Sequence, residues 1–194
     1  EVSSHALALG RVDAVRFDVA GFTNLSQDHL DFHHDMASYF AAKAALFTPA
    51  HSRAGVVTVD DEWGARLAES AGVPVTTLGA RAGDWRHDDA AGDTVLTAPD
   101  GHQEVVSTQL IGEVNLANAA LAYLMLISAG QDSGASRRGI GELRAIPGRM
   151  EPVDAGQPYL ALVDYAHTPA AVTRLLADAH QLAAPGGRVL IVLG

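Results

Sequence analysis

The chain has 194 residues, 48% of them hydrophobic, which is enough to bury a sizeable core, so a single domain is the default expectation. Its net charge of -10 argues against a general nucleic-acid binder, because phosphate backbones are held by clustered Lys and Arg, but it leaves small phosphorylated ligands open. The absence of cysteine excludes a disulfide framework and a thiolate zinc site.

No segment predicts a membrane span. The longest apolar run, Leu116 to Gly130, includes Asn118 and Ser128 and is shorter than the roughly 20 residues that cross a bilayer. No basic segment with a cleavage site opens the chain. We therefore expect a cytoplasmic protein without membrane or nucleic-acid partners, and we expect a monomer.

The first 25 residues predict a short helix followed by a strand. EVSSHALALGR, residues 1–11, has the pattern of a strand end and a helix start, with Ser4 as a cap. Alternation through residues 13–25 then leads into Val19 to Phe22, which predicts a buried parallel strand. This strand delivers the polar loop that follows it.

Residues 22–47 combine a polar loop with an apolar helix. The loop is rich in histidine and aspartate, and Asp35 is a good N-cap for the helix, which Thr48-Pro49 ends. One helix face carries, at spacings of four, three and four, Met36, Phe40, Lys43 and Phe47. Lys43 is the only lysine in a chain with twelve arginines, so its primary amine is a candidate functional group.

Two interpretations of Lys43 remain open. A lysine on an apolar stripe usually buries its stem and extends its amine to water. Alternatively, burial keeps the amine neutral, and a neutral amine can add carbon dioxide to become a carbamate. Beside His29, a carbamate would be an oxygen ligand for a hard cation such as magnesium.

The middle of the chain predicts two further parallel strands. Residues 55–63 form an apolar run ended by Asp60 and Asp61, which could contact a nucleotide but better suit the N-cap of a helix over 64–71. Residues 73–79 predict another strand. The polar stretch from Arg81 to Ala91 predicts a loop or an edge, with His87 as a solvated residue.

A hairpin and a long helix follow. Pro99-Asp100-Gly101 is a turn signal between two β-rich runs, so residues 93–112 predict an antiparallel hairpin. A helix follows and closes at Gly130. Asn115 and Asn118 lie on one face of it and, if buried, either bond core backbone or offer amide edges to adenine.

The last third predicts a helix broken at Pro147-Gly148, so that a turn presents Arg149. A buried strand, Leu160 to Val163, then ends at Asp164, and Thr168-Pro169 starts a helix. Asp164 and His167 would thus occupy the ligand edge of the sheet. The apolar run from Arg188 to Gly194 predicts a final strand.

These elements predict an α/β fold: a mostly parallel, Rossmann-like sheet flanked by helices, with a small antiparallel hairpin. No GxxxxGK[ST] phosphate loop occurs in the chain.

Four ordered motifs resemble the central, ATP-binding domain of the Mur ligases, in particular the MurE type. They are EVSSHALALGR, TNLSQDHLDFH with SYFAAKAALF, GEVNLANAALA, and IPGRMEPVDAGQPYLALVDYAHTPAAV. The resemblance implies that residues 1–194 are a partial central domain. The N-terminal UDP-binding domain with the P-loop segment and the C-terminal amino-acid-binding domain would then be absent.

The resemblance also implies roles for ten residues. Glu1, His29 and carbamylated Lys43 would bind Mg2+, with Lys43 and His29 catalytic. Ser3 and Arg11 would hold the UDP-MurNAc-dipeptide, although Leu9 stands where some members place glutamine. For ATP, Asn115 and Asn118 would contact the base and Arg149 a phosphate. Asp164 would contact the ribose, with His167 close by.

The function implied is ATP-dependent ligation of a diamino acid, meso-diaminopimelate, to UDP-MurNAc-L-Ala-D-Glu in peptidoglycan synthesis. Alternatives are an L-lysine-adding MurE, a ligase of the folylpolyglutamate synthase kind, a metal-dependent hydrolase, or a nucleotide-binding fragment without catalysis. We expect the isolated fragment to be inactive because the phosphate loop is missing.

Overall fold

A six-stranded sheet forms the centre of the protein, whose residues 1–90 and 92–193 are described by a computed structural model. The strands lie side by side in chain order: β1 (Phe17–Phe22), β2 (Ser52–Thr58), β3 (Val75–Gly79), β4 (Trp85–Ala90), β5 (Asp93–Thr97) and β6 (Gln103–Ser107). Strands β1 to β4 pair in parallel, whereas β4, β5 and β6 pair antiparallel. The predicted α/β fold with a mostly parallel sheet and an antiparallel hairpin is confirmed.

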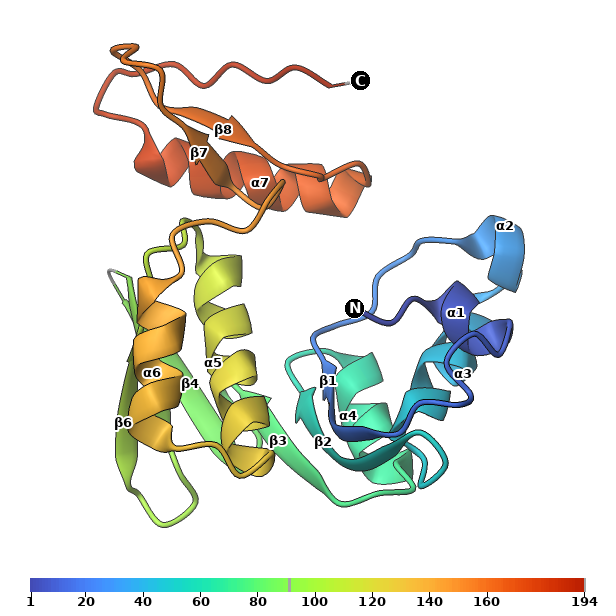
Figure 1. Ribbon diagram of the computed structural model, residues 1–194. Helices are drawn as coiled ribbons and strands as arrows, with labels where there is room; N and C mark the ends of the chain where they lie inside the picture. Colours follow the sequence, from blue (N-terminus) through green and yellow to red (C-terminus); the bar gives the residue numbers. More distant parts are fainter. Residues whose placement is uncertain (91, 194) are drawn as a thin grey trace.

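Helices cover both faces of this sheet (Figure 1). The helices before residue 146 are α1 (Ser4–Ala8), α2 (Leu30–His33), α3 (Met36–Ala44) with the short 3-10 helix η1 (Ala45–Phe47), α4 (Glu62–Ser70), α5 (Glu113–Ser128) and α6 (Ser133–Glu142), of which α1 and α2 pack against α3. Adjacent residues of β2 point to opposite faces: Val57 packs with Phe40 of α3 and Leu67 of α4, whereas Val56 packs with Tyr123 of α5. The sheet therefore has one core on each side. None of the described helices is long and apolar enough to cross a membrane.

The predicted helix starts are found in the structure. The Asp35 carboxylate accepts a hydrogen bond from Ser38 N at 2.7 Å, and Asp61 accepts one from Gly64 N at 2.7 Å. The second oxygen of Asp61 lies 3.3 Å from Leu25 N, so this cap also holds the segment before the polar loop. The first helix differs from expectation, because Ser3 rather than Ser4 caps it by accepting from Ala6 N.

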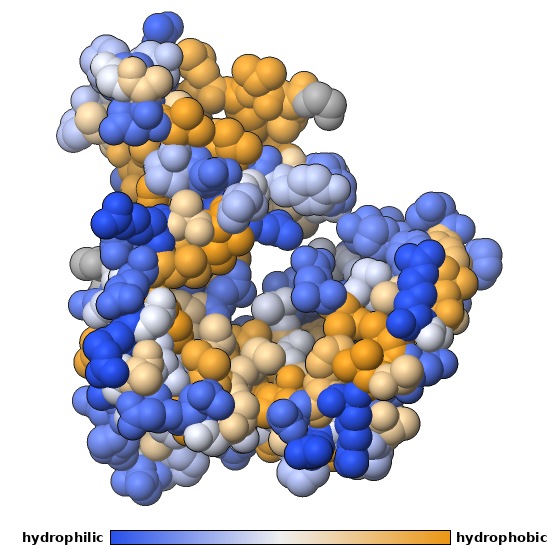
Figure 2. Space-filling view, viewed as in Figure 1, coloured by the Kyte–Doolittle hydropathy of each residue, from blue (hydrophilic) through white to orange (hydrophobic). Residues whose placement is uncertain are grey.

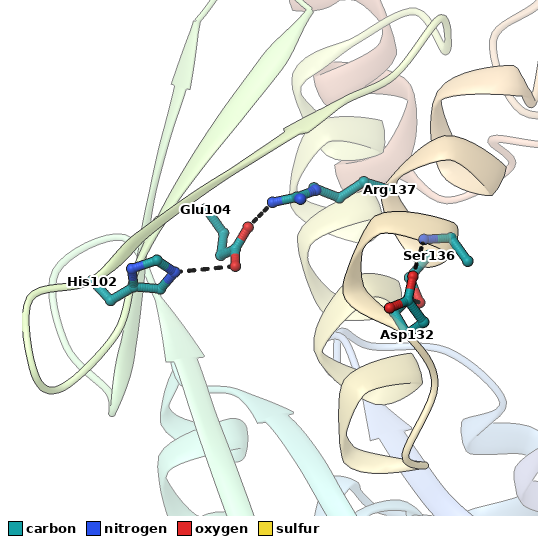
Figure 3. Close-up of polar contacts among 6 residues, drawn as sticks. His102, Glu104, Asp132, Ser136 and Arg137 are labelled. Atoms are coloured by element: carbon teal, nitrogen blue, oxygen red, sulfur yellow. Dashed lines mark hydrogen bonds and ion pairs between the residues drawn. The ribbon is translucent and has the colours of Figure 1, made fainter.

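The hairpin is tied to α6 by an ion pair (Figure 3). Glu104 on β6 contacts Arg137 of α6 through one oxygen and His102 through the other, at 3.1 Å. Helix α6 starts at the Asp132 cap and ends at Glu142, five residues before the predicted break at Pro147. The prediction of a helix reaching that proline was therefore wrong.

The predicted loop or edge over 81–91 holds for residues 81–84 but was wrong for residues 85–90, and Ala91 lies outside the described residues. Residues 85–90 form β4, an interior strand bonded to β3 and β5. His87 is not solvated: its side chain is 8% exposed and lies between Asp60 and Asp89, with Nδ1 3.0 Å from Asp89 Oδ2. Pairing on both sides orders a strand whose polar residues gave no strand pattern.

A second unit follows residue 146 and carries β7 (Glu151–Val153), β8 (Ala161–Val163) and α7 (Pro169–Leu182). Strand β8 pairs only with β7, antiparallel, so the predicted buried strand is a partly exposed one outside the main sheet. Residues 188–193 form no strand, although the apolar run predicted one; Val192 is 97% exposed. A strand needs a neighbour for its backbone groups, and this run has none in the described residues.

Candidate functional site

The loop after β1 and the helix α3 bring the predicted metal ligands to one side of the molecule. Lys43 is half-buried in the last turn of α3, and its Nζ lies 5.9 Å from the centre of the Tyr39 ring. Burial lowers the pKa of the Lys43 amine, while the carboxylates of Glu1 and Asp28 oppose that shift. The amine thus has the partial desolvation that the carbamate hypothesis needs, although its acidic neighbours favour the charged form.

His29 projects from a left-handed turn at the start of α2. Its φ is 54°, and its backbone N donates to Asp28 Oδ1 at 2.8 Å. Its side chain is 43% exposed and lies edge-on to the rings of His5 and Tyr39. A residue other than glycine in this conformation is uncommon and often occurs at functional sites. His34, at the other end of α2, also has a positive φ, of 67°.

A buried hydrogen bond lies beneath this loop. His33 Nε2 is 2.9 Å from Ser4 Oγ, and the His33 ring stacks on Tyr39 with ring centres 5.1 Å apart. Burial, and then the neighbouring His5 and His29, lower the pKa of His33. His33 is therefore a neutral imidazole packed inside the protein rather than a further open ligand.

The three residues proposed as substrate or metal contacts around α1 differ in exposure and bonding. Glu1 is exposed just before the helix, and Arg11 is exposed in the turn after it. Ser3 uses its hydroxyl oxygen to accept from Ala6 N at 3.1 Å. Its O–H hydrogen has no acceptor among the described residues, so it can donate to a ligand.

The donor chemistry fits magnesium only as a partly protein-made site. Within residues 1–90 and 92–193, no group of three or more His, Cys, Asp or Glu side chains could hold a metal ion. Magnesium usually keeps waters and uses one or two carboxylates together with substrate phosphates. The Glu1 carboxylate and a carbamate on Lys43 match that pattern, whereas the His29 imidazole would add a nitrogen ligand.

The two asparagines of α5 differ. Asn115 is buried and its Nδ2 donates to Ile111 O at 2.7 Å, whereas Asn118 is exposed. Only Asn115 therefore meets the condition of burial, and its amide nitrogen bonds backbone as one of the two alternatives predicted. The Oδ1 acceptor of Asn115 has no hydrogen bond to another described residue.

The second unit contributes a turn with three of the predicted nucleotide contacts. Asp164 accepts from the backbone N of Met150 and of Ala166, both at 2.8 Å, so its carboxylate holds the turn together. The exposed Arg149 guanidinium lies 5.8 Å from the centre of the Tyr165 ring. Met150 of this turn lies close to the start of α5. A Cβ atom placed on Gly112, the residue before α5, would lie 3.7 Å from the Met150 Cγ.

One contact joins this turn to the metal loop. His167 Nε2 lies 3.7 Å from Asp28 Oδ2. Figure 2 shows a hollow between the second unit and the α1–α3 region. Asp28 also lies 3.6 Å from His29 Nδ1. Segments more than 130 residues apart in the sequence therefore meet beside the predicted ligands.

Sequence reasoning missed several residues of this site. Asp28, His33 and Tyr39 have no assigned role above, although each contacts or adjoins a predicted ligand. The available signal was the density of polar residues around His29. Asp28 and His33 each also have a partner distant in sequence, His167 and Ser4, and only the fold reveals these pairings.

Comparison with family models divides the chain. Residues 1–126 match the Mur ligase middle domain, and residues 148–194 match the Mur ligase glutamate ligase domain. The second match differs from the expectation that all 194 residues lie in the central domain, and it coincides with the second unit.

The curated relatives are ligases. A UDP-N-acetylmuramoyl-L-alanyl-D-glutamate--2,6-diaminopimelate ligase of Streptomyces avermitilis is 47% identical over 202 residues, covering 100% of this chain and 40% of its own length. The protein of the same name from Streptomyces coelicolor is 49% identical over 184 residues, with 91% and 36% covered. The chain thus spans about two fifths of the length of these relatives.

Solved structures agree with the fold. A structure titled UDP-N-acetylmuramoyl-L-alanyl-D-glutamate--2,6-diaminopimelate ligase is 29% identical, with a TM-score of 0.74 over 92% of this chain and 38% of that one. Escherichia coli FolC in complex with ADP is 25% identical, with a TM-score of 0.68 over 86% and 39%. From the motifs, the fold and the match over residues 1–126, this chain belongs to the Mur ligase family.

Proposed function

We propose that the chain is part of an ATP-dependent ligase that joins a diamino acid, meso-diaminopimelate, to UDP-MurNAc-L-Ala-D-Glu. The observation that carries the proposal is the meeting of the two units at Asp28 and His167, beside His29 and Lys43. The names of the relatives support the diaminopimelate acceptor. Because this chain spans two fifths of their length, the activity belongs to the complete protein.

The proposed reaction has two steps. The terminal phosphoryl group of ATP moves to an oxygen of the dipeptide carboxylate, releasing ADP and leaving an acyl phosphate. The amine of the diamino acid then attacks the acyl carbon and loses a proton, an amide bond forms, and phosphate leaves. Several anionic oxygens must approach one another, so positive charge and hydrogen-bond donors must offset their repulsion.

The chain's own residues would orient these groups. Ser3 and Arg11 would donate to the UDP-MurNAc-dipeptide from α1 and the turn after it, since the Ser3 hydroxyl hydrogen is free. Carbamylated Lys43 and His29 would hold the catalytic ion, with Glu1 as a ligand of a second ion. Magnesium, when bound, would neutralise phosphate charge.

The nucleotide would lie toward the second unit. Asn115 would offer its free Oδ1 to adenine, and Asn118 would add an exposed amide. Arg149 is exposed and would bind a phosphate, for which a planar guanidinium is well suited. Asp164 would accept from the ribose while holding its turn, with His167 nearby.

The domain organisation and location follow as proposals. We assign residues 1–126 to the central ATP-binding domain and residues 148–194 to the beginning of the next domain, on the basis of the two family matches. The phosphate loop and the UDP-binding domain would precede Glu1. A monomer in the cytoplasm fits an enzyme of nucleotide-linked cell-wall precursors.

The test is turnover by the complete ligase that contains this segment. Phosphate release should require ATP, magnesium, UDP-MurNAc-L-Ala-D-Glu and meso-diaminopimelate together, and mass spectrometry should detect the tripeptide product. Replacing diaminopimelate by L-lysine or the dipeptide by a folate identifies the alternative acceptors. Hydrolysis without ATP, or nucleotide binding without ligation, would overturn the proposal.

A further inference from the structure

A hydrogen bond between two buried side chains fixes α1 against the loop that carries His29. His33 Nε2 lies 2.9 Å from Ser4 Oγ, and the two residues expose only 6% and 1% of their surface. They are 29 residues apart in sequence. Leaving either group without its partner would cost the desolvation of a buried polar atom, so the bond strongly favours one relative placement of the segments.

The His33 imidazole also packs against the Tyr39 ring, which two of the proposed metal ligands, His29 and Lys43, adjoin. His33 stacks on Tyr39, with the ring planes 22° apart. His29 meets that ring edge-on at 5.9 Å between centres, and the Lys43 amine lies 5.9 Å from the ring centre on the same helix. Tyr39 is itself buried, so it cannot shift without moving its neighbours.

We propose that His33 is a positioning residue that acts through Ser4 and Tyr39. The Ser4 bond sets where Glu1 lies at the head of α1, and the Tyr39 stack sets where His29 and Lys43 lie. His33 thereby fixes where the Glu1 ligand of one proposed ion lies relative to the His29 and Lys43 ligands of the other, and hence the affinity for the ions. The inference rests on the proposed function and adds a residue that touches neither substrate nor metal.

The size of the effect follows from other metal sites. Partners that orient metal ligands without touching the ion typically change affinity or activity by about 10- to 100-fold when removed. Burial lowers the pKa of His33, so the ring is neutral near pH 7 and one of its nitrogens has no proton. A neutral ring suits a bond with a hydroxyl, which can donate or accept.

The test uses Mn2+ as a spectroscopic probe in the complete ligase with a non-hydrolysable ATP analogue. His33→Gln can place its amide near the position of Nε2, whereas the shorter His33→Asn can reach only the position of Nδ1. We expect His33→Asn and Ser4→Ala to weaken Mn2+ binding by about 10- to 100-fold and to lower kcat with little change in the KM for the UDP-dipeptide. His33→Gln should keep most of the affinity.

Two further measurements separate positioning from general damage. The double variant His33→Asn with Ser4→Ala should be no weaker than either single variant, because both remove one bond. The exposed His102, changed to Gln, is the matched control and should leave Mn2+ binding unchanged. Thermal unfolding of each variant checks that the fold persists, and Ser4→Ala tests the bond without altering the ring.

The outcomes are distinguishable. Wild-type Mn2+ affinity in both His33→Asn and Ser4→Ala, in a ligase that turns over, overturns the positioning role and leaves the proposed function intact. Equal losses in His33→Gln and His33→Asn also overturn it, because the Nε2 position would then be irrelevant. A wild-type ligase without ATP-dependent ligation overturns the proposed function, and the positioning role with it.

Discussion

Two buried histidines, His33 and His87, show how similar residues serve different purposes in one sheet protein. His87 on β4 lies between the carboxylates of Asp60 and Asp89, so both of its ring nitrogens face side chains of the group itself. His33 bonds a neutral hydroxyl and stacks on Tyr39, while the polar groups around it, His29 and Lys43, remain partly open. Polar groups that contact one another, as around His87, stabilise the fold, whereas partly exposed polar groups, as around His33, can bind a ligand.

The largest expected effect is a loss of ligation activity when the region around His33 is changed at Lys43. Lys43→Ala should lower ligation by the complete enzyme by at least about 100-fold, because it removes the carbamate that would hold the ion whose charge offsets that of the phosphates. Millimolar acetate should restore part of the rate by replacing the carbamate. Phosphate release measures both.

The matched control for Lys43 is Arg66→Ala. Arg66 also places a cation over an aromatic ring, that of Phe40, but lies on α4. Its loss should leave turnover intact. Wild-type activity in Lys43→Ala would refute the carbamate hypothesis.

The opposite effect is expected at His87. His87→Ala should lower the free energy of unfolding by about 2 kcal/mol, because Asp60 and Asp89 lose the ring that separates them. Urea unfolding measures this, and the rate per folded enzyme should not change. His102→Ala, on the exposed hairpin end, should change stability by less than about 0.5 kcal/mol. Equal stability of the two variants would mean that the His87 cluster contributes nothing.

A smaller effect is expected where the regions are joined. Asp61→Ala removes the cap of α4 and the contact with Leu25 N, and should cost about 1 kcal/mol of unfolding free energy. Asp61→Asn keeps an acceptor oxygen and should recover most of the loss. Thermal unfolding of the pair distinguishes this from a simple charge effect, in which Asn would behave like Ala.

The smallest effect is a pH dependence due to His33. The pKa of His33 in the folded state is lowered from 6.5, so below pH 6.5 the unfolded state binds more protons than the folded state. The free energy of unfolding therefore decreases as the pH falls from 6.5 to the folded pKa. Above pH 6.5 this contribution is constant. The slope cannot exceed about 1.4 kcal/mol per pH unit for one proton. Urea unfolding between pH 5 and 7 should show a shallower slope for His33→Gln than for wild type; an equal slope would place the titration elsewhere.

The sequence predicted local structure well where residue type decides it. Asp35, Asp61 and Thr168 were expected to start helices and do so, since capping is a contact within three residues. The hairpin around Pro99-Asp100-Gly101 was correct for the same reason. The motifs also sufficed to indicate the Mur ligase family.

Only the tertiary structure decided which distant segments meet. Strand β4 is stabilised by its pairing with neighbours on both sides. Its polar residues do not have the pattern of a strand, and for that reason the sequence wrongly predicted a solvated His87. The 188–193 run has strand composition but lacks a pairing partner among the described residues. The Ser4–His33 bond and the Asp28–His167 contact depend on the folded chain, because composition specifies a group's chemistry and only folding supplies its partner.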